Sequence, residues 1–388
     1  MASCGSVVHV PRPFHNRCIP DVLFEIGSLL TPKSLRELSR TCRYAHEVLL
    51  PLRLRSIEVH QRLSGEQPFY QFIHSVIARG YGHHVRKFSL HFDQELCYDQ
   101  AQLEFAMRGM PHLKHLGVEG YENQDAWDPL FAFLANNSGV FRLKSLRLSG
   151  MKAATPNVLS VLESQPGIEE LMIDWMEDIV VPRQSLPGLR IVAARPRAMR
   201  SLIPGRPITH VASRYRHFQR GVEEPLMEST EFITHYWAYS VTTAELPQLL
   251  PGMPYVRSLT LILNRDCSFH SSPTSQLKDA WTYIKDMKCL EFCAIVVRGS
   301  YLRGLNFEQA IPTIPKTLRH IVVCFLYIYG PWVQLLREDG RDGWEYVEGY
   351  ENRSDNIPMH NIDSHFWVSL IPTATIRTKM SSTFGVEC

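Results

Sequence analysis

The sequence lacks the features that would place its function outside the cell or in a membrane. Its nine cysteines are an odd number and include no Cys-x-x-Cys pair, which argues against a disulfide framework and against a zinc ribbon. The longest apolar run, residues 321–329, is too short to span a bilayer. Residues 1–18 hold no apolar segment like that of a secretory signal and are expected to be a flexible tail. We therefore expect a soluble protein of the cytoplasm or nucleus.

The chain also has little net charge. Its 41 basic and 39 acidic residues give a formal charge of +2, so we expect no global attraction to nucleic acid or to an anionic membrane. The apolar fraction of 45% is sufficient for a large core. The length of 388 residues predicts two or three domain-sized units.

Catalytic motifs are missing as well. The sequence contains no Gly-x-Ser-x-Gly elbow, no phosphate-binding loop and no His-Glu-x-x-His. His83 and His84 are adjacent, but neighbouring side chains on an extended segment point to opposite sides. We therefore expect no catalytic residue, no metal ligand and no cofactor, and a hydrolase is the least favoured hypothesis.

Three short amphipathic segments lie near the start of the chain. The first follows Pro20 and repeats apolar residues with the helix period, and the second begins with Thr31 and Pro32, an N-cap and a proline at the first helical position. The third is expected to be helical until Pro51 disturbs it, after which apolar and polar residues alternate through residue 59. Three helices of this length bury too little apolar surface to be stable alone, so they need a partner chain or the rest of the protein.

Residues 19–54 resemble the F-box, the motif by which substrate receptors dock on the Skp-type adaptor of cullin ubiquitin ligases, and they read IPDVLFEIGSLLTPKSLRELSRTCRYAHEVLLPLRL. The resemblance implies an F-box domain over residues 19–59. It also implies that adaptor contacts are made by the residues at the family's proline and apolar positions, which are Ile19, Pro20, Leu23, Ile26, Leu30, Leu35 and Leu38. An ordinary helical cap on the body of the protein is the alternative.

From residue 85 a short apolar pattern recurs, in which one apolar residue is followed three and five positions later by two more. The last two positions alternate with polar ones, as in a strand, and neighbouring copies are about 19 to 30 residues apart. The clear copies are Val85, Phe88, Leu90; Leu113, Leu116, Val118; Leu143, Leu146, Leu148; Ile168, Leu171, Ile173; Leu189, Val192, Ala194; Val256, Leu259, Leu261; and Leu318, Ile321, Val323. Weaker copies are Ile208 with Val211, and Leu290, Cys293, Ile295.

Helical periodicity fills the stretches between copies, and prolines separate the two kinds of element. Pro111, Pro166, Pro187 and Pro254 each stand two residues before the first apolar position of a copy, where they end a helix and favour extended backbone. Strands and helices therefore alternate, and stacking the units buries a continuous core. A generic α/β domain, whose strands happen to share this pattern, is the alternative.

This body resembles the divergent leucine-rich repeats behind F-boxes in fungal, basidiomycete-type receptors. The predicted fold class is α/β, with an N-terminal three-helix F-box followed by a curved leucine-rich-repeat-like solenoid of parallel strands and helices over residues 80–330. Residues 222–248 fit no copy. Residues 331–388 are expected to form a C-terminal cap and tail, because a bare solenoid end would expose its core.

A local excess of arginine suggests a binding surface on two neighbouring copies. Residues 179–222 include no acidic side chain. Four arginines lie six and eight positions after the first apolar residue of successive copies, and we expect them to point outward as one cluster: Arg195, Arg197, Arg214 and Arg216. Like charges on adjacent strands repel, so an anion should lie there. It is either an acidic or phosphorylated segment of a target protein, or Asp174 together with Glu177 and Asp178.

Two functions are compatible with these features. The first is a substrate-recognition subunit of a Skp/cullin/F-box E3 ubiquitin ligase, which docks on the adaptor, and through it on a cullin scaffold, while the solenoid binds a target protein. The alternative is a repeat-protein interaction scaffold without a ligase. Neither requires a catalytic group on this chain.

Overall fold

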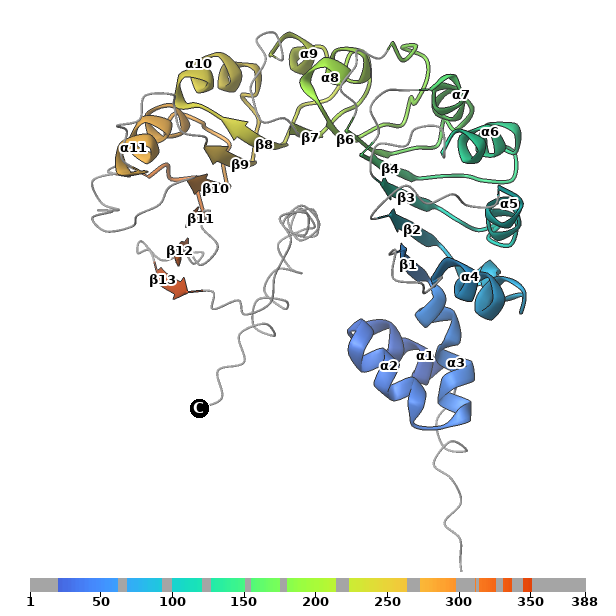
Figure 1. Ribbon diagram of the computed structural model, residues 1–388. Coiled ribbons are helices and arrows are strands. Elements are labelled where there is room, and N and C mark those ends of the chain that lie inside the picture. Colours follow the sequence, from blue (N-terminus) through green and yellow to red (C-terminus); the bar gives the residue numbers. More distant parts are fainter. Residues whose placement is uncertain are drawn as a thin grey trace, which may run out of the picture. The chain divides into compact units, whose positions relative to one another are not determined.

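The computed structural model describes residues 20–61, 68–92, 100–120, 127–150, 155–174, 180–213, 223–263, 273–297, 311, 314–325, 331–336 and 345–350 (Figure 1). None of the helices in these ranges is long and apolar enough to cross a membrane. The chain divides into two compact units, Met1–Leu189 and Arg190–Cys388.

The first unit begins with a three-helix head, which consists of α1 (Pro20–Leu29), α2 (Pro32–Arg40) and α3 (Arg43–Leu54). The hydroxyl of Thr31 accepts a hydrogen bond from the backbone N–H of Ser34 at 3.2 Å, as expected of an N-cap. The expectation that Pro51 disturbs the third helix is wrong, because α3 continues through it to Leu54.

The core of the head is small. Leu23, Leu35, Ala45 and Leu49 are buried together, and Leu49 is completely buried. Gly27 allows α1 to approach α3 closely, since a Cβ at this position would lie 2.5 Å from a methyl carbon of Leu49. The head therefore has a hydrophobic core of its own, although only four buried residues among those described form it.

The rest of the first unit is a parallel sheet covered by helices on one face (Figure 1). Its strands pair in chain order and are β1 (Ser56–Gln61), β2 (Lys87–Phe92), β3 (His115–Gly120), β4 (Ser145–Ser149) and β5 (Glu170–Ile173). Between them lie α4 (Pro68–Phe72), the π-helical turn η2 (Ile73–Ile77), the 3-10 turn η3 (Tyr81–His84), α5 (Gln100–Arg108), α6 (Asp128–Asn136) and α7 (Pro156–Ser164).

The repeat starts earlier than expected. β1 follows α3 directly and pairs with β2, with Ile57 opposite Phe88 and Val59 opposite Leu90. Leu54, Ile57 and Val59 have the repeat spacing, so the residues after the third helix are already a copy of the pattern. The sheet thus begins well before residue 80, inside the segment assigned to the head.

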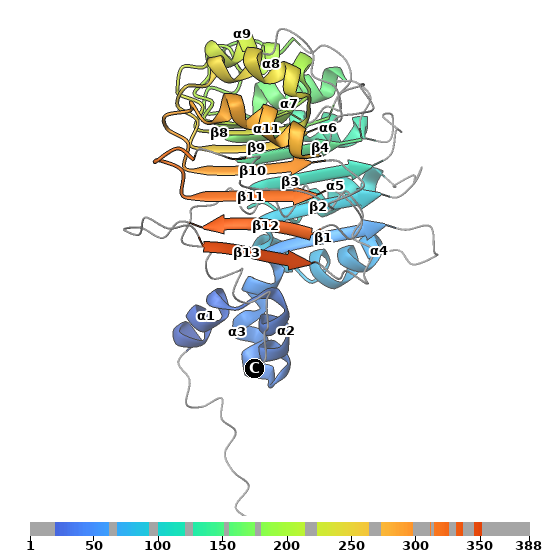
Figure 2. The same ribbon diagram turned by 90° about the vertical axis from the view of Figure 1, so that its left-hand side faces the viewer.

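The second unit continues the same alternation of strand and helix (Figure 2). The parallel strands are β6 (Ile191–Ala194), β7 (His210–Ser213), β8 (His235–Val241), β9 (Ser258–Leu263), β10 (Phe292–Val297) and β11 (His320–Phe325). The helical elements are α8 (Pro196–Leu202), α9 (Glu223–Met227), η5 (Thr243–Glu245), α10 (Leu246–Leu249), η6 (Leu250–Gly252) and α11 (Pro273–Ile284).

Two features of this unit fall where the repeat pattern gave no copy. Residues 222–248 contain β8, and Ile233, Tyr236 and Ala238 occupy the three buried positions. In the segment expected to be a cap, β12 (Pro331–Leu336) and β13 (Glu345–Tyr350) add two antiparallel strands after β11. Residues 337–344 and 351–388 lie outside the described ranges.

The α/β fold class, with parallel strands alternating with helices, is confirmed. The predicted copies supply the core: all three apolar residues of each clear copy are buried, and most are completely inaccessible. The alternating positions between them lie on the opposite face of the sheet, where none of the helices in the described ranges lies (Figures 1 and 2). In the first unit the alternating residues of the first strands include exposed polar side chains such as Glu58 and His60, whereas in the second unit several of them, such as Trp237 and Ile262, are buried.

Candidate functional site

An apolar stripe is exposed on the first helix of the head. Val22, Ile26 and Leu29 are 49%, 45% and 86% exposed. They follow one another at four and three residues along α1, so they share one face of the helix. Leu23, about a quarter of a turn away around the helix, belongs to the core of the head. The head thus presents an uncovered apolar surface to its surroundings.

The predicted adaptor-binding residues divide into three groups. Pro20 and Ile26 are exposed, Leu23 and Leu35 are buried in the core, and Leu30 and Leu38 are half-buried against it. Ile19 lies outside the described residues. The buried members hold the head together, so their substitution would damage its fold as well as any interface.

Sequence reasoning missed Val22 and Leu29. Their spacing with Ile26 is a helix face in its own right, and this signal was present in the sequence. The helix has apolar residues on two faces, however, and the sequence does not show which face packs inward.

The four predicted target-binding arginines are only partly described. Arg195 follows β6 directly and is half-buried as the N-cap residue of α8, whereas Arg197 is exposed in the first turn of that helix. β6 and β7 pair in parallel up to Ala194 opposite Ser213, as the common register requires. Arg214 and Arg216 lie outside the described residues. Whether the four form one cluster therefore stays a prediction.

A second basic surface lies between the head and the first strands. A cleft of ≈ 540 Å³ is lined by Phe24, Pro51, Leu52, Arg55, Ser56, His84, Arg86, Lys87, Lys114 and His115. Four of these side chains are permanently cationic, and this described lining includes no acidic residue. Burial lowers the pKa of both His84 and His115, and neighbouring basic residues add to the lowering, whereas Glu170 opposes it at His115. The cleft therefore favours an anion.

The repeat explains why these cations gather. Each stands immediately before or at the start of a strand, and hydrogen bonds join these positions from copy to copy. The backbone N–H of Arg86 donates to the carbonyl of Arg55, and that of Lys114 donates to the carbonyl of Arg86. The next copy has Lys144 at this position, where it forms an ion pair with Glu169. A basic residue before four successive strands was the sequence signal for this cleft.

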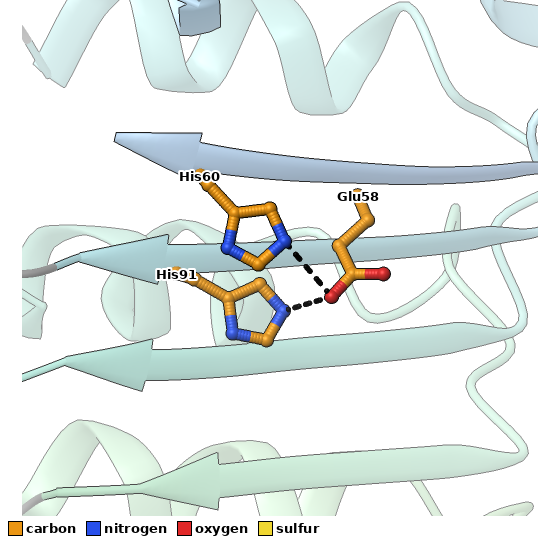
Figure 3. A group of neighbouring side chains, drawn as sticks. All are labelled: Glu58, His60 and His91. Carbon is orange, nitrogen blue, oxygen red and sulfur yellow. Dashed lines mark ion pairs between the residues drawn. The ribbon is translucent and has the colours of Figure 1, made fainter. Parts of the chain in front are cut away.

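A third group lies on the helix-free face of the first sheet, and Figure 3 shows its three side chains. Glu58 and His60 come from β1 and His91 from β2. Oε1 of Glu58 lies 3.1 Å from Nε2 of His60 and 2.9 Å from Nε2 of His91 (Figure 3). The two imidazole rings stack with centroids 4.5 Å apart and planes at 13°.

The third strand extends this group. Oε2 of Glu119 on β3 lies 3.0 Å from Nδ1 of His91 and 3.8 Å from Nη2 of Arg147 on β4. Burial alone would lower the pKa of His91, but its contacts with Glu119 and Glu58 outweigh burial and raise that pKa to about 9. The contact with His91 lowers the pKa of Glu58 to about 2. The group is therefore strongly coupled.

Sequence reasoning missed this group. Once the copy at residues 54–59 is recognised, His60, His91 and Glu119 share the position six residues after the first apolar residue of their copies. Arg195 has the same position in a later copy. His83 and His84, the pair considered from the sequence, instead pack against each other on η3 with ring centroids 3.8 Å apart.

Comparisons with known proteins identify no family for this chain. No family model matches it, and no curated protein does. Among solved structures, a chain of the "Crystal structure of Rad7 and Elc1 complex in yeast" is similar at 14% identity and a TM-score of 0.39. The match covers 78% of this chain and 91% of that chain. A TM-score this low does not establish a common fold.

Proposed function

We propose that this protein is a substrate-recognition subunit of a Skp/cullin/F-box E3 ubiquitin ligase. The observation that carries the proposal is the exposed apolar face of α1, formed by Val22, Ile26 and Leu29, on a three-helix head that precedes a body of strand-helix repeats. The F-box resemblance of residues 19–54 supports a Skp-type adaptor as the partner for this face.

The energetics favour a partner on α1. Full burial of an exposed large apolar side chain is worth about 1.5–3 kcal/mol; Leu29 would gain most of this, and the half-exposed Val22 and Ile26 about half of it each. The head itself buries few apolar residues, and a partner that covers the stripe would also stabilise the head. Among the other predicted contacts, Pro20 borders the stripe at the start of α1.

The body would hold the target protein. The basic cleft suits an acidic or phosphorylated segment, because guanidinium and ammonium groups bind carboxylate and phosphate. Arg195, Arg197, Arg214 and Arg216 are a second candidate surface for the same kind of segment. Holding a target beside a charged conjugating enzyme raises its effective concentration, so the receptor needs no catalytic group of its own.

Co-purification tests the ligase assignment. The tagged full chain is recovered from cells, and its associated adaptor and cullin are measured for wild type and for Ile26→Asp with Leu29→Asp. The matched control is Val140→Asp with Val180→Asp, which places the same charges on apolar residues that are 53% and 83% exposed elsewhere in the first unit. We expect the α1 variant to lose adaptor and cullin, and the control to keep both.

Recovery of the adaptor by both variants alike would contradict the docking surface. The scaffold alternative predicts that target proteins are recovered without any adaptor or cullin. The arginine surface is tested in the same assay by Arg195→Glu with Arg214→Glu. If this surface reads the target, the double variant keeps the adaptor and loses the target, and unchanged target recovery would rule the surface out.

A further inference from the structure

We propose that Glu58, His60 and His91 bind a Zn²⁺ ion on the helix-free face of the first sheet, with Glu119 orienting His91. The three ligand atoms lie within 4.8 Å of one another (Figure 3). Two imidazole nitrogens and one carboxylate oxygen are a donor set that zinc binds in proteins, with a fourth position left for water or another ligand. This inference does not depend on the proposed function.

The backbone brings the donors together. Glu58 and His60 are two residues apart on β1, so their side chains leave the same face of the sheet. The parallel register places His60 opposite His91, and His91 opposite Glu119. The donors thus come from rigid, hydrogen-bonded strands, which hold a metal site more precisely than loops do.

Glu119 supplies the support that metal-binding histidines usually have. Oε2 of Glu119 lies 3.0 Å from Nδ1 of His91, so this nitrogen would keep its proton when Nε2 gives up its own to bind an ion. Nε2 of His91 is buried and, among the described residues, makes no hydrogen bond of acceptable geometry, although Oε1 of Glu58 is only 2.9 Å away. An ion placed between this nitrogen and Oε1 of Glu58 would replace their direct contact.

The distances from Glu58 require only small adjustments, but the stacked ring of His60 must also rotate out of its nearly parallel position for both Nε2 lone pairs to meet at one ion. Zinc lies about 2.0–2.2 Å from nitrogen and oxygen ligands, which places tetrahedral ligand atoms about 3.3–3.5 Å apart. The separations of 3.1 and 2.9 Å from Glu58 to the two histidines would widen slightly. The side chains of Glu58 and His60 are 57% and 54% exposed, so both can rotate around an ion. His91, which is 22% exposed, would stay in place against Glu119.

A proton is the competing occupant. His91 carrying a proton on both nitrogens could satisfy Glu58 and Glu119 without any metal, and the distances alone do not separate these two states. Metal titration does, because His60 is required for zinc binding and is dispensable for the protonated arrangement of His91.

The test uses the full chain, freed of metal by a chelator and titrated with Co²⁺ and then with Zn²⁺. With 17 histidines and nine cysteines some binding elsewhere is expected, so the measured quantity is the difference between variants. His60→Phe retains a ring that can stack on His91 and removes the donor nitrogen. The control is His235→Phe, which replaces one imidazole of another stacked histidine pair; the ring centroids of His235 and His210 are 4.0 Å apart.

We expect wild type and His235→Phe to bind one equivalent that gives the visible spectrum of tetrahedral Co²⁺ and is displaced by Zn²⁺. His60→Phe should lose that equivalent, and Glu119→Gln should weaken it about 10- to 100-fold. His91→Gln should also lose it. If His91→Gln does not fold, His60→Phe decides the matter, because the substituted side chain is more than half exposed. Equal stoichiometry and affinity in wild type and His60→Phe would overturn the proposal.

Discussion

The spacing of β3 and β4 can be tested with three glycines of the first unit. Gly150, which follows β4, has φ of +82°, and a Cβ on it would collide with the carbonyl oxygen of Gly120 and lie 2.8 Å from its carbonyl carbon. Gly80 has φ of +76° but nothing within 4 Å of its Cβ position. Gly139 has an ordinary φ and the same open surroundings. Alanine at these positions therefore separates backbone strain from steric collision.

The expected changes in the free energy of unfolding differ in sign and size among the three variants. Gly139→Ala should stabilise slightly, by about 0.4–1 kcal/mol, because it restricts only the unfolded chain. Gly80→Ala should destabilise by about 1–2 kcal/mol, the cost of a left-handed conformation for a residue with a side chain. Gly150→Ala adds to that cost the displacement of a strand end, about 1–3 kcal/mol, so its total should be about 2–5 kcal/mol.

Urea unfolding of the full chain measures this series, with hydrogen exchange at the amides of β3 and β4 assigning the change to the first unit. Gly150→Ala should lower protection in both strands, whereas Gly139→Ala should not. A loss in Gly150→Ala no greater than in Gly80→Ala would show that the ends of β3 and β4 are not this close, and the packing of these copies would be wrong.

Three further perturbations follow from the structure. Leu49→Ala should lower the stability of the three-helix head by about 2–5 kcal/mol, because the side chain is completely buried. Thermal unfolding would measure this loss. Burial and His235 lower the pKa of His210 to about 4, so the unfolded state, with an ordinary pKa near 6.5, binds more protons. Stability of the second unit should therefore fall between about pH 6.5 and pH 4, by an amount on the order of 1 kcal/mol after allowance for partial exposure, and His210→Gln should flatten this dependence in calorimetry. Arg55→Glu with Lys114→Glu should abolish binding of a fluorescent phosphopeptide that wild type binds more weakly as salt rises; unchanged binding would exclude the cleft.

The repeated core was predictable because burial imposes a simple rule on strands. Leu143, Leu146 and Leu148 are all completely buried, as their spacing required. The copy at β8 was missed although its spacing is regular; residue 231, two positions before Ile233, is a glutamate, so the copy lacks the proline that marks four of the others. Which side chain fits a buried position depends on the neighbouring strands and helices, and the local sequence does not show the shape of the space that they leave.

The candidate sites were harder to predict, for a different reason. His60, His91 and Glu119 are far apart in the sequence and meet only through the register of three strands. The copy that contains His60 was assigned to the head, because no turn residues separate it from the third helix, which contains Pro51. One unrecognised copy was enough to hide the group, because the neighbours of a residue on adjacent strands can be predicted only when its position in a repeat copy is known.

The central claim is that the exposed face of α1 binds a Skp-type adaptor, and calorimetric titration of purified adaptor into the purified full chain tests it most directly. Leu29 is 86% exposed, so Leu29→Asp should leave the fold intact while costing about 2 kcal/mol or more of binding. We predict a micromolar or tighter complex for wild type and for Val180→Asp, and binding at least about 30-fold weaker for Leu29→Asp. No binding by the folded wild-type chain, or equal affinity for all three proteins, would contradict the account.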